Sequence, residues 1–333
     1  MKVTINDVAR EAGVSKSTVS RVLSNNDRIS DETKEKVNEV IKRLGYKPNL
    51  LARNLAKSTT RTLGVILPIE AGDYFGNPIF IQIMQGISIF AQEHNYYIMY
   101  AFGKDKSEEQ SIKEFSSNGI VDGIIMLKSE ENDKTMKYLT KIKFPFVVIG
   151  RPVDDDSILW VDNDNYKSTY ELTEELILKG IKKISFISAR ESWTVSKDRL
   201  AGYKKALKEY SIECNENLIY QGESFTEVTG YNAIKDILNK EEAEAIITTD
   251  DLLALGVNRY LGEVNKQDKF VIGFNNTAIA AYQKPSLSSV EIYGEKLGYE
   301  SSKLLVDYLE GKEIPCRHKI IDTKLIERES YKK

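Results

Sequence analysis

An alternation of short apolar segments with longer amphipathic segments, starting at Leu63, most limits the folds open to this chain. The apolar segments, which we expect to be strands, are TLGVILP, YYIMYAF, VDGIIML, FPFVVIG, KISFISA, EAIITTD and KFVIGFN. Apolar residues recur at helical spacing between most of them, at 79–94, 166–179, 199–210 and 226–239. Such alternation predicts α/β architecture, with parallel sheets covered by helices on both faces. The region is long enough for two doubly wound subdomains with a cleft between them.

The first 45 residues lack this alternation and carry three short helical patterns instead. The residues placed to cap these helices are Thr4, Ser15 and Ser30. Thr4 is followed three residues later by Asp7, which is the spacing of a capping box. Gly13 and Gly45 follow the first and third patterns, where glycine commonly ends a helix. We therefore expect three helices, the first two joined by a sharp turn.

The second helical pattern has the two faces that a DNA-reading helix needs. In a helix-turn-helix, this helix lies in the major groove with its N-terminal side chains on base edges. One face is apolar, with Val19, Val22 and Leu23, and the opposite face carries Lys16, Ser17, Ser20 and Arg21. The Arg21 guanidinium can donate two hydrogen bonds to guanine or bind a phosphate. Spacing alone leaves open a surface three-helix bundle without a ligand.

The charge of the chain is divided unevenly. Residues 1–60 contain 12 Lys and Arg against 7 Asp and Glu, whereas the remaining residues contain 35 against 43. A basic head on an acidic body indicates that only the head meets a polyanion such as DNA.

The sequence divides into a head with the helix-turn-helix pattern at 1–47, a short helix and polar tether at 48–61, and a body of two subdomains at 62–333. Pro48 favours an extended segment before it, and Asn49 can cap a short helix that ends at Lys57. A helix of this length is marginal alone in water. We expect it to fold only on DNA.

Several motifs resemble those of the lactose-repressor/galactose-repressor (LacI/GalR) family. In the head and hinge they are DVAREAGVSKSTVSRVL, GYKPNLLARNLA and TLGVILP, and in the body DRLAGYKKAL, TTDDLLALG, VIGFNN and KPSLSSV. The similarity extends over essentially the whole chain. Within that family the chain resembles the maltose-responsive regulators of Gram-positive bacteria. The resemblance implies a repressor in which 48–61 form the hinge helix and tether. It also implies that 62–333 form a periplasmic-binding-protein-like body of two interleaved subdomains, which binds the effector and dimerises.

The resemblance implies DNA contacts from Thr4, Ser15, Lys16, Ser17, Thr18, Ser20, Arg21, Asn49, Ala52 and Leu55. Lys16 and Ser17 would choose the operator sequence. Leu55 would be the wedge that enters the minor groove at the operator centre and partly unstacks one base step. Ordinary packing against the head is the alternative role for Leu55.

In the body, the resemblance places the effector in the cleft, with Asn77, Phe80, Arg151, Trp193, Arg199, Phe225, Asp250 and Asn275 as candidate contacts. Asp250 and Asn275 follow predicted strands, at the end where open α/β sheets bind ligands. The rings of Trp193 and Phe225 suit the apolar face of a sugar. Each residue has an alternative: Asp250 can simply cap a helix, the aromatic rings can be core, and Arg199 can form a surface ion pair.

Asn275 departs from the family pattern, because many members carry an aspartate there. An amide both donates and accepts without charge, which favours a neutral, hydroxyl-rich effector of the maltose type. A purine or a sugar phosphate remains the alternative, since Arg199 and Arg151 could meet an anion.

Other classes of protein fit less well. The two histidines, His94 and His318, are isolated, and we find no nucleophile, phosphate-loop or metal-ligand motif. The acidic run at 154–156 is expected to be a solvated loop. We therefore expect neither an enzyme nor a cofactor. A transport protein would need a signal peptide, which the N-terminus lacks.

Location and assembly follow from similar observations. No apolar run approaches the ~20 residues that a membrane helix needs, so we expect a cytoplasmic protein. Cys214 and Cys316 lack metal-type spacing and are expected to be reduced thiols. Because the C-terminus carries no heptad tail, the expected assembly is a homodimer on a two-fold symmetric operator.

Overall fold

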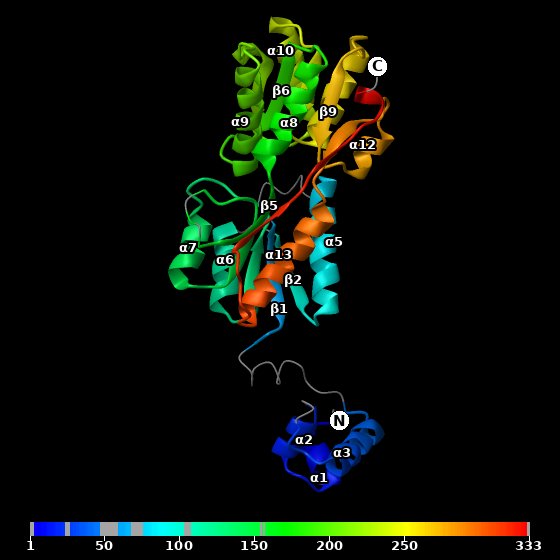
Figure 1. The fold of residues 1–333 in the computed structure, drawn as a ribbon. Helices are drawn as coiled ribbons and strands as arrows, with labels where there is room; N and C mark the ends of the chain where they lie inside the picture. Colours follow the sequence, from blue (N-terminus) through cyan, green and yellow to red (C-terminus); the bar gives the residue numbers. More distant parts are fainter. Residues whose placement is uncertain are drawn as a thin grey trace. The chain divides into compact units, whose positions relative to one another are not determined.

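The computed structural model describes residues 3–23, 27–46, 59–67, 76–102, 108–153, 155 and 157–331. The chain divides into two compact units, Met1–Thr60 and Arg61–Lys333, which we call the head and the body (Figure 1). None of the described helices is long and apolar enough to cross a membrane.

The described part of the head contains three helices packed around a small apolar core. They are α1 (Ile5–Ala12), α2 (Lys16–Leu23) and α3 (Asp31–Leu44). The predicted apolar stripes meet in this core, where Val8, Ala12, Val19 and Val37 are fully buried.

Local polar interactions define where these helices begin and end, as predicted. The Asp7 carboxylate accepts hydrogen bonds from the backbone N (3.0 Å) and hydroxyl (2.7 Å) of Thr4. The hydroxyls of Ser15 and Ser30 accept from the backbone N of the residue three positions later. Gly13 and Gly45 adopt φ of 65° and 61°, the left-handed region that glycine enters at least cost.

The body consists of two lobes, each with a six-stranded sheet (Figure 1). The sheet of lobe 1 has the order β11-β5-β4-β3-β1-β2, and all its strands are parallel. Its strands are β1 (Thr62–Leu67), β2 (Tyr97–Phe102), β3 (Gly123–Met126), β4 (Phe146–Ile149), β5 (Leu159–Asn163) and β11 (His318–Ile321). Its helices are α5 (Pro78–Glu93), α6 (Glu108–Ser117), α7 (Lys134–Ile142) and α13 (Gly294–Leu309).

The sheet of lobe 2 has the order β12-β10-β9-β8-β6-β7 and is parallel except for the β10–β12 pair. Its strands are β6 (Ile184–Ala189), β7 (Ile219–Gly222), β8 (Ala245–Thr248), β9 (Phe270–Phe274), β10 (Ser288–Glu291) and β12 (Lys324–Ile326). Its helices are α8 (Asn165–Leu178), α9 (Thr194–Glu209), α10 (Glu227–Lys240), α11 (Asp251–Glu263) and α12 (Ala278–Tyr282), with 3-10 turns at Glu216–Leu218 and Glu329–Tyr331.

Alternate residues of β1 show why both faces of a sheet carry helices. Leu63 and Val65 belong to the core cluster that contains Ile83 of α5, whereas Ile66 belongs to the cluster that contains Ile112 of α6. Since successive side chains of a strand point to opposite faces, a strand apolar on both faces needs helices on both sides. This confirms the predicted class of two parallel-sheet α/β subdomains.

The chain passes between the lobes after β5, after β10 and between β11 and β12. Each lobe is therefore assembled from segments that are distant in sequence. All seven predicted strands are present, but β5, β7, β10, β11 and β12 were not predicted.

Gly202 allows α9 to approach α8 closely, and this contact positions Arg199 one turn earlier. A Cβ at Gly202 would lie 2.2 Å from the backbone O of Tyr166. Gly202→Ala should therefore lower the free energy of unfolding by about 1–3 kcal/mol, the usual cost of overpacking. Gly262→Ala is the matched control in α11, where a Cβ would meet only the side-chain end of Gln267 at 3.4 Å. Urea denaturation of both variants checks this, and equal effects would contradict it.

Candidate functional site

The exposed face of α2 carries the residues predicted to read DNA. Val19 and Val22 are buried, which turns Lys16, Ser17, Ser20 and Arg21 to solvent. The half-buried Thr18 donates its backbone N–H to Ser15 (3.0 Å), so both help to form the start of the helix. The other predicted DNA contacts, Asn49, Ala52 and Leu55, lie outside the described residues, as does the predicted hinge helix.

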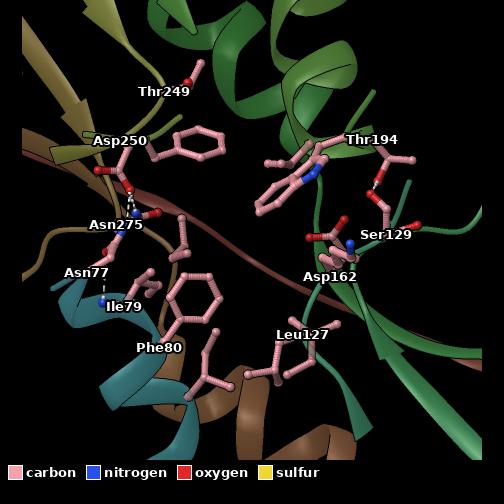
Figure 2. Close-up of a pocket in the computed structure, with 18 of the residues that line it drawn as sticks. Asn77, Ile79, Phe80, Leu127, Ser129, Asp162, Thr194, Thr249, Asp250 and Asn275 are labelled. Carbon is pink, nitrogen blue, oxygen red and sulfur yellow. Dashed lines mark hydrogen bonds between the residues drawn. The ribbon is translucent and has the colours of Figure 1, made fainter. Parts of the chain in front are cut away.

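A pocket between the two lobes of the body contains most of the predicted effector residues (Figure 2). It encloses about 990 Å³, counting its opening to solvent. The predicted residues that line it are Asn77, Phe80, Trp193, Arg199, Phe225, Asp250 and Asn275. Lobe 1 also contributes Lys128, Ser129, Asp162 and Asn163, and lobe 2 contributes Arg190, Thr194, Ser224 and Thr249. Many of these residues stand at the carboxyl ends of strands, where open α/β sheets bind ligands.

Arg151 is the predicted effector residue that does not line this pocket. Its guanidinium forms two hydrogen bonds with the Asp198 carboxylate of α9, at 2.7 and 3.1 Å. The Arg151 side chain thereby joins lobe 1 to lobe 2 beside the pocket. Sequence position did not reveal this pairing, because the partner lies 47 residues away in the other lobe.

Asp250 connects the lobes on another side of the pocket (Figure 2). One carboxylate oxygen accepts from the backbone N of Leu252 (2.6 Å) and caps α11. The other accepts from the side-chain amides of Asn77 in lobe 1 and Asn275 in lobe 2, both at 2.8 Å. The capping role that sequence left open is therefore present, together with a bridge between lobes.

Asn77 takes part in this bridge because it also begins α5. Its side-chain oxygen accepts from the backbone N of Ile79 (3.2 Å), and Pro78 occupies the first helical position, where a missing N–H costs nothing. The side-chain oxygen of Asn77 thus accepts a hydrogen bond from its own helix, while its side-chain nitrogen donates one to Asp250.

Burial changes the charge balance of the pocket. It raises the pKa of the Asp250 carboxyl to about 6, although hydrogen bonds from Asn77 and Asn275 act in the opposite direction. Burial likewise raises the pKa of Asp162 to about 6 and lowers that of Arg199 to about 10.

Asn275→Asp should make stability depend on pH, because it places two buried carboxylates in contact. Like charges would raise the pKa of the pair further, above the unfolded value of about 4. When the two carboxyls share a proton, their contribution to the free energy of unfolding is fully present below about pH 4. That contribution is lost as the pH rises through the raised pKa of the folded state. The melting temperature should therefore fall further below wild type at pH 8 than at pH 5. A difference that is constant with pH would contradict this.

Arg199 lies inside the body and not in the surface ion pair that sequence left open. It is 3% exposed, and its Nε and Nη1 donate to Asn165 Oδ1 (2.9 Å) and the backbone O of Thr249 (2.7 Å). Its guanidinium also stacks over the ring of Phe274, 4.0 Å from the centroid. Its remaining nitrogen, Nη2, has no hydrogen-bond partner among the described residues and can serve a ligand.

Aromatic side chains form an apolar part of the pocket wall. The ring of Trp193 lies 5.4 Å from that of Phe225 at an angle of 41°, and Phe80 of lobe 1 packs against the same cluster. Trp193 is buried, as the core alternative expected, yet it also lines the pocket. Planar rings beside hydrogen-bonding groups suit a ligand with an apolar face and a polar rim.

Two lining residues that sequence reasoning missed, Lys128 and Asp162, follow or end short strands of lobe 1. Only their position at the carboxyl end of the sheet could have identified them. Of the acidic run at 154–156, residues 154 and 156 lie outside the described residues.

The reading helix and the pocket together define a class of protein: a helix-turn-helix DNA-binding head joined to a two-lobed ligand-binding body. Comparisons with known proteins agree with this class. Residues 4–49 match the model described as bacterial regulatory proteins, lacI family, and residues 173–331 match the periplasmic binding protein-like domain.

Relatives match along nearly the whole chain. The HTH-type transcriptional regulator MalR of Streptococcus pneumoniae is 39% identical, covering 98% of this chain and 100% of that protein. A solved complex of the transcriptional regulator CelR with cellobiose has a TM-score of 0.76 at 28% identity, covering 98% of this chain and 99% of the other. A putative LacI transcriptional regulator from Bacillus cereus subsp. cytotoxis has a TM-score of 0.78 at 36% identity, covering 82% and 98%.

The chain therefore belongs to the LacI family of bacterial transcriptional regulators.

Proposed function

We propose that this protein is a dimeric repressor of sugar-utilisation genes, controlled by a neutral, maltose-type oligosaccharide bound between the lobes of its body. The single observation that carries the effector half is the pocket, where two lobes contribute aromatic rings, amides and Arg199 to one cavity. The likeness to CelR, whose solved complex contains cellobiose, supports a neutral oligosaccharide as the ligand.

The proposal that the head binds operator DNA rests on the exposed face of α2. A three-helix head of this size covers only a half-site, so high affinity requires two heads at one spacing on a two-fold symmetric operator. Because operator DNA is intracellular, we place the protein in the cytoplasm. We assign it no catalytic activity, since the proposed roles of the pocket residues are all in binding.

The groups that face the pocket suit uncharged hydroxyls. The side-chain nitrogen of Asn275 donates to Asp250, whereas its side-chain oxygen has no hydrogen-bond partner among the described residues and can accept from a ligand. Arg199 Nη2 can donate, and the aromatic cluster offers an apolar surface. A sugar has hydroxyls that donate and accept around an apolar ring face, which matches this mixture.

A sugar phosphate is the second candidate, favoured by one observation. Three cationic residues, Lys128, Arg190 and Arg199, line the pocket, against two acidic ones, Asp162 and Asp250. If the cationic groups decide the ligand, an anion would bind more tightly than maltose.

Titration calorimetry of the full-length protein distinguishes the two candidates. The panel is maltose, cellobiose, glucose 6-phosphate and a purine base. We expect maltose to bind and to change operator affinity in a gel shift. Binding of glucose 6-phosphate alone would overturn the neutral-sugar proposal and leave the regulator intact.

The two halves should be coupled through the spacing of the heads. A ligand that binds one arrangement of the lobes better than another shifts the population toward it, and operator affinity changes in consequence. Coupling of this kind is typically ~1–3 kcal/mol, or roughly 5–150-fold in affinity. The predicted hinge at 48–61 is where we expect this change to reach the head.

A further inference from the structure

Three segments of the chain cross between the lobes of the body, and one side chain joins them. The crossovers start after β5, after β10 and after β11. The side-chain nitrogen of Asn163, the last residue of β5, donates to the backbone O of Ile292 (3.1 Å) and to that of Ile321 (2.9 Å). Ile292 directly follows β10, and Ile321 is the last residue of β11. One amide nitrogen therefore connects all three crossovers.

The position of the Asn163 amide is itself fixed. Asn163 and Ile321 are register partners at the end of the parallel β5–β11 pair. The backbone N–H of Asn163 donates to Asp162 Oδ1 (2.7 Å), and its backbone O accepts from Asn165 Nδ2 (3.3 Å). Asn163 is 6% exposed. Because bulk water has little access to this site, hydrogen bonds that are lost there are poorly replaced.

The second crossover is bent directly beside the acceptor of Asn163. Tyr293 has φ of 56°, a left-handed conformation that a tyrosine adopts only at a cost. Its backbone N–H donates to Glu291 Oε1 (2.6 Å), and Glu291 Oε2 accepts from Asn276 Nδ2 (2.7 Å). Ile292 is thus followed by a bend that neighbouring side chains hold in place. Hinges in proteins are commonly a few residues of this kind at the ends of elements.

We propose that Asn163 is the positioning residue of the hinge between the lobes. It makes the three crossovers turn together, so that closure of the lobes on an effector moves lobe 1, which the tether joins, as one unit. This inference rests on the proposed function, because it assumes that a ligand between the lobes changes operator affinity. It deepens that function by naming the residue that passes binding in the body on to the head.

The physical reason lies in the number of arrangements open to the body. Without the amide, each crossover can adjust its own backbone dihedral angles, and the lobes can take up many intermediate arrangements. A ligand changes operator affinity only through the difference between the arrangements that it favours and those that it does not favour. When the crossovers move separately, this difference is averaged over many arrangements and the coupling falls.

The first test measures coupling apart from ligand affinity. Asn163→Leu keeps a similar volume but removes the N–H donors. Gel shifts of the full-length protein without maltose and with saturating maltose give the ratio of two operator affinities, in which a changed affinity for maltose has no part. We expect this ratio to fall toward 1, by roughly 2- to 30-fold, the range for residues that carry coupling. Asn163→Ala, which leaves room for water at the two carbonyls, should show the same loss with a smaller fall in melting temperature.

A matched control separates coupling from stability. Leu139 is fully buried in α7 of lobe 1, lies at none of the three crossovers and does not line the pocket. Leu139→Ala should lower the melting temperature by creating a cavity but should keep the wild-type ratio.

The second test observes the lobes directly and needs no sugar. Spin labels are placed at Ser117→Cys in α6 of lobe 1 and at Lys208→Cys in α9 of lobe 2, both exposed, with the native Cys214 and Cys316 replaced by serine. Dilution with unlabelled protomers restricts the measured distances to those within one body. Asn163→Leu should broaden the distance distribution relative to wild type, whereas the control variant should not.

The outcomes separate the two proposals. With a sugar that changes operator affinity in the wild type, the inference is wrong if Asn163→Leu keeps either the wild-type ratio or the wild-type width of the distance distribution, and the proposed function then stands. An equal loss of coupling in Leu139→Ala would also overturn it, because coupling would then follow stability. If the wild type responds to no sugar of the panel, the proposed function fails, while the sugar-free distance distributions still decide whether Asn163 holds the lobes.

Discussion

Replacing Arg21 by alanine should abolish specific operator binding while leaving the head folded. Arg21 is exposed on the face of α2 opposite the buried Val19 and Val22, so the side chain can be removed without opening the core. Loss of one bidentate base contact costs about 1–3 kcal/mol, and a dimer would lose it twice. The combined loss would bring operator affinity close to that for unrelated DNA.

Gel shifts against operator and scrambled DNA, repeated at several salt concentrations, measure this effect. If Arg21 reads a base, specificity should fall; if it binds only a phosphate, affinity should fall for every sequence with a shallower salt dependence. Arg43→Ala is the charge-matched control, since Arg43 pairs with Glu11 (2.9 Å) elsewhere on the head. Unchanged affinity and specificity in Arg21→Ala would remove this residue from the reading face.

Arg199→Ala should greatly weaken binding of the effector by the repressor without abolishing operator binding. The variant loses the Nη2 donor to the ligand and also leaves Asn165 Oδ1 and the backbone O of Thr249 without their donor. Hydrogen bonds to a charged group contribute about 1.5–3 kcal/mol each. We therefore expect maltose affinity to fall by about 10- to 160-fold for the one hydrogen bond lost to the ligand, with some loss of thermal stability.

Two further variants distinguish ligand binding from structural damage. Arg199→Lys keeps the charge but not the planar fork, so it should retain more stability than alanine and still bind maltose poorly. Arg151→Ala removes a guanidinium that is bound to Asp198 outside the pocket lining, and maltose affinity should change little. If Arg151→Ala lost maltose binding as completely as Arg199→Ala, Arg199 would have no special place in the site.

Features that depend on neighbouring residues could be read from the sequence. The capping residues Thr4, Ser15 and Ser30 and the terminating Gly13 and Gly45 act within one turn of their own helix, so their effect is local. Six of the seven predicted strands have long apolar runs because they are buried on both faces between helices. The seventh, β2, lies at the edge of its sheet, where Tyr97, Met99 and Tyr100 are exposed.

The five strands that sequence missed lack that signal. Three of the four residues of β11 are exposed, and β7 has no fully buried residue. Strands of this kind form at the edges of sheets, or where the chain crosses between lobes, and a neighbouring strand stabilises them. Their pairing partners are remote in sequence, as for β11 beside β5, so no local pattern predicts them.

For this protein, the sequence by itself determined the head, the α/β class of the body and seven residues that line one pocket, because each depends on local periodicity or on a motif. Only the tertiary structure decided which lobe each segment joins, that Arg151 binds Asp198, and that Asp250 both caps α11 and bridges to Asn77. Within the described part of the chain, it also left the indole N–H of Trp193 without a partner. The fold brings these side chains together from positions that are far apart in the sequence. Hydrogen bonds and burial depend on the resulting distances in space and not on sequence order.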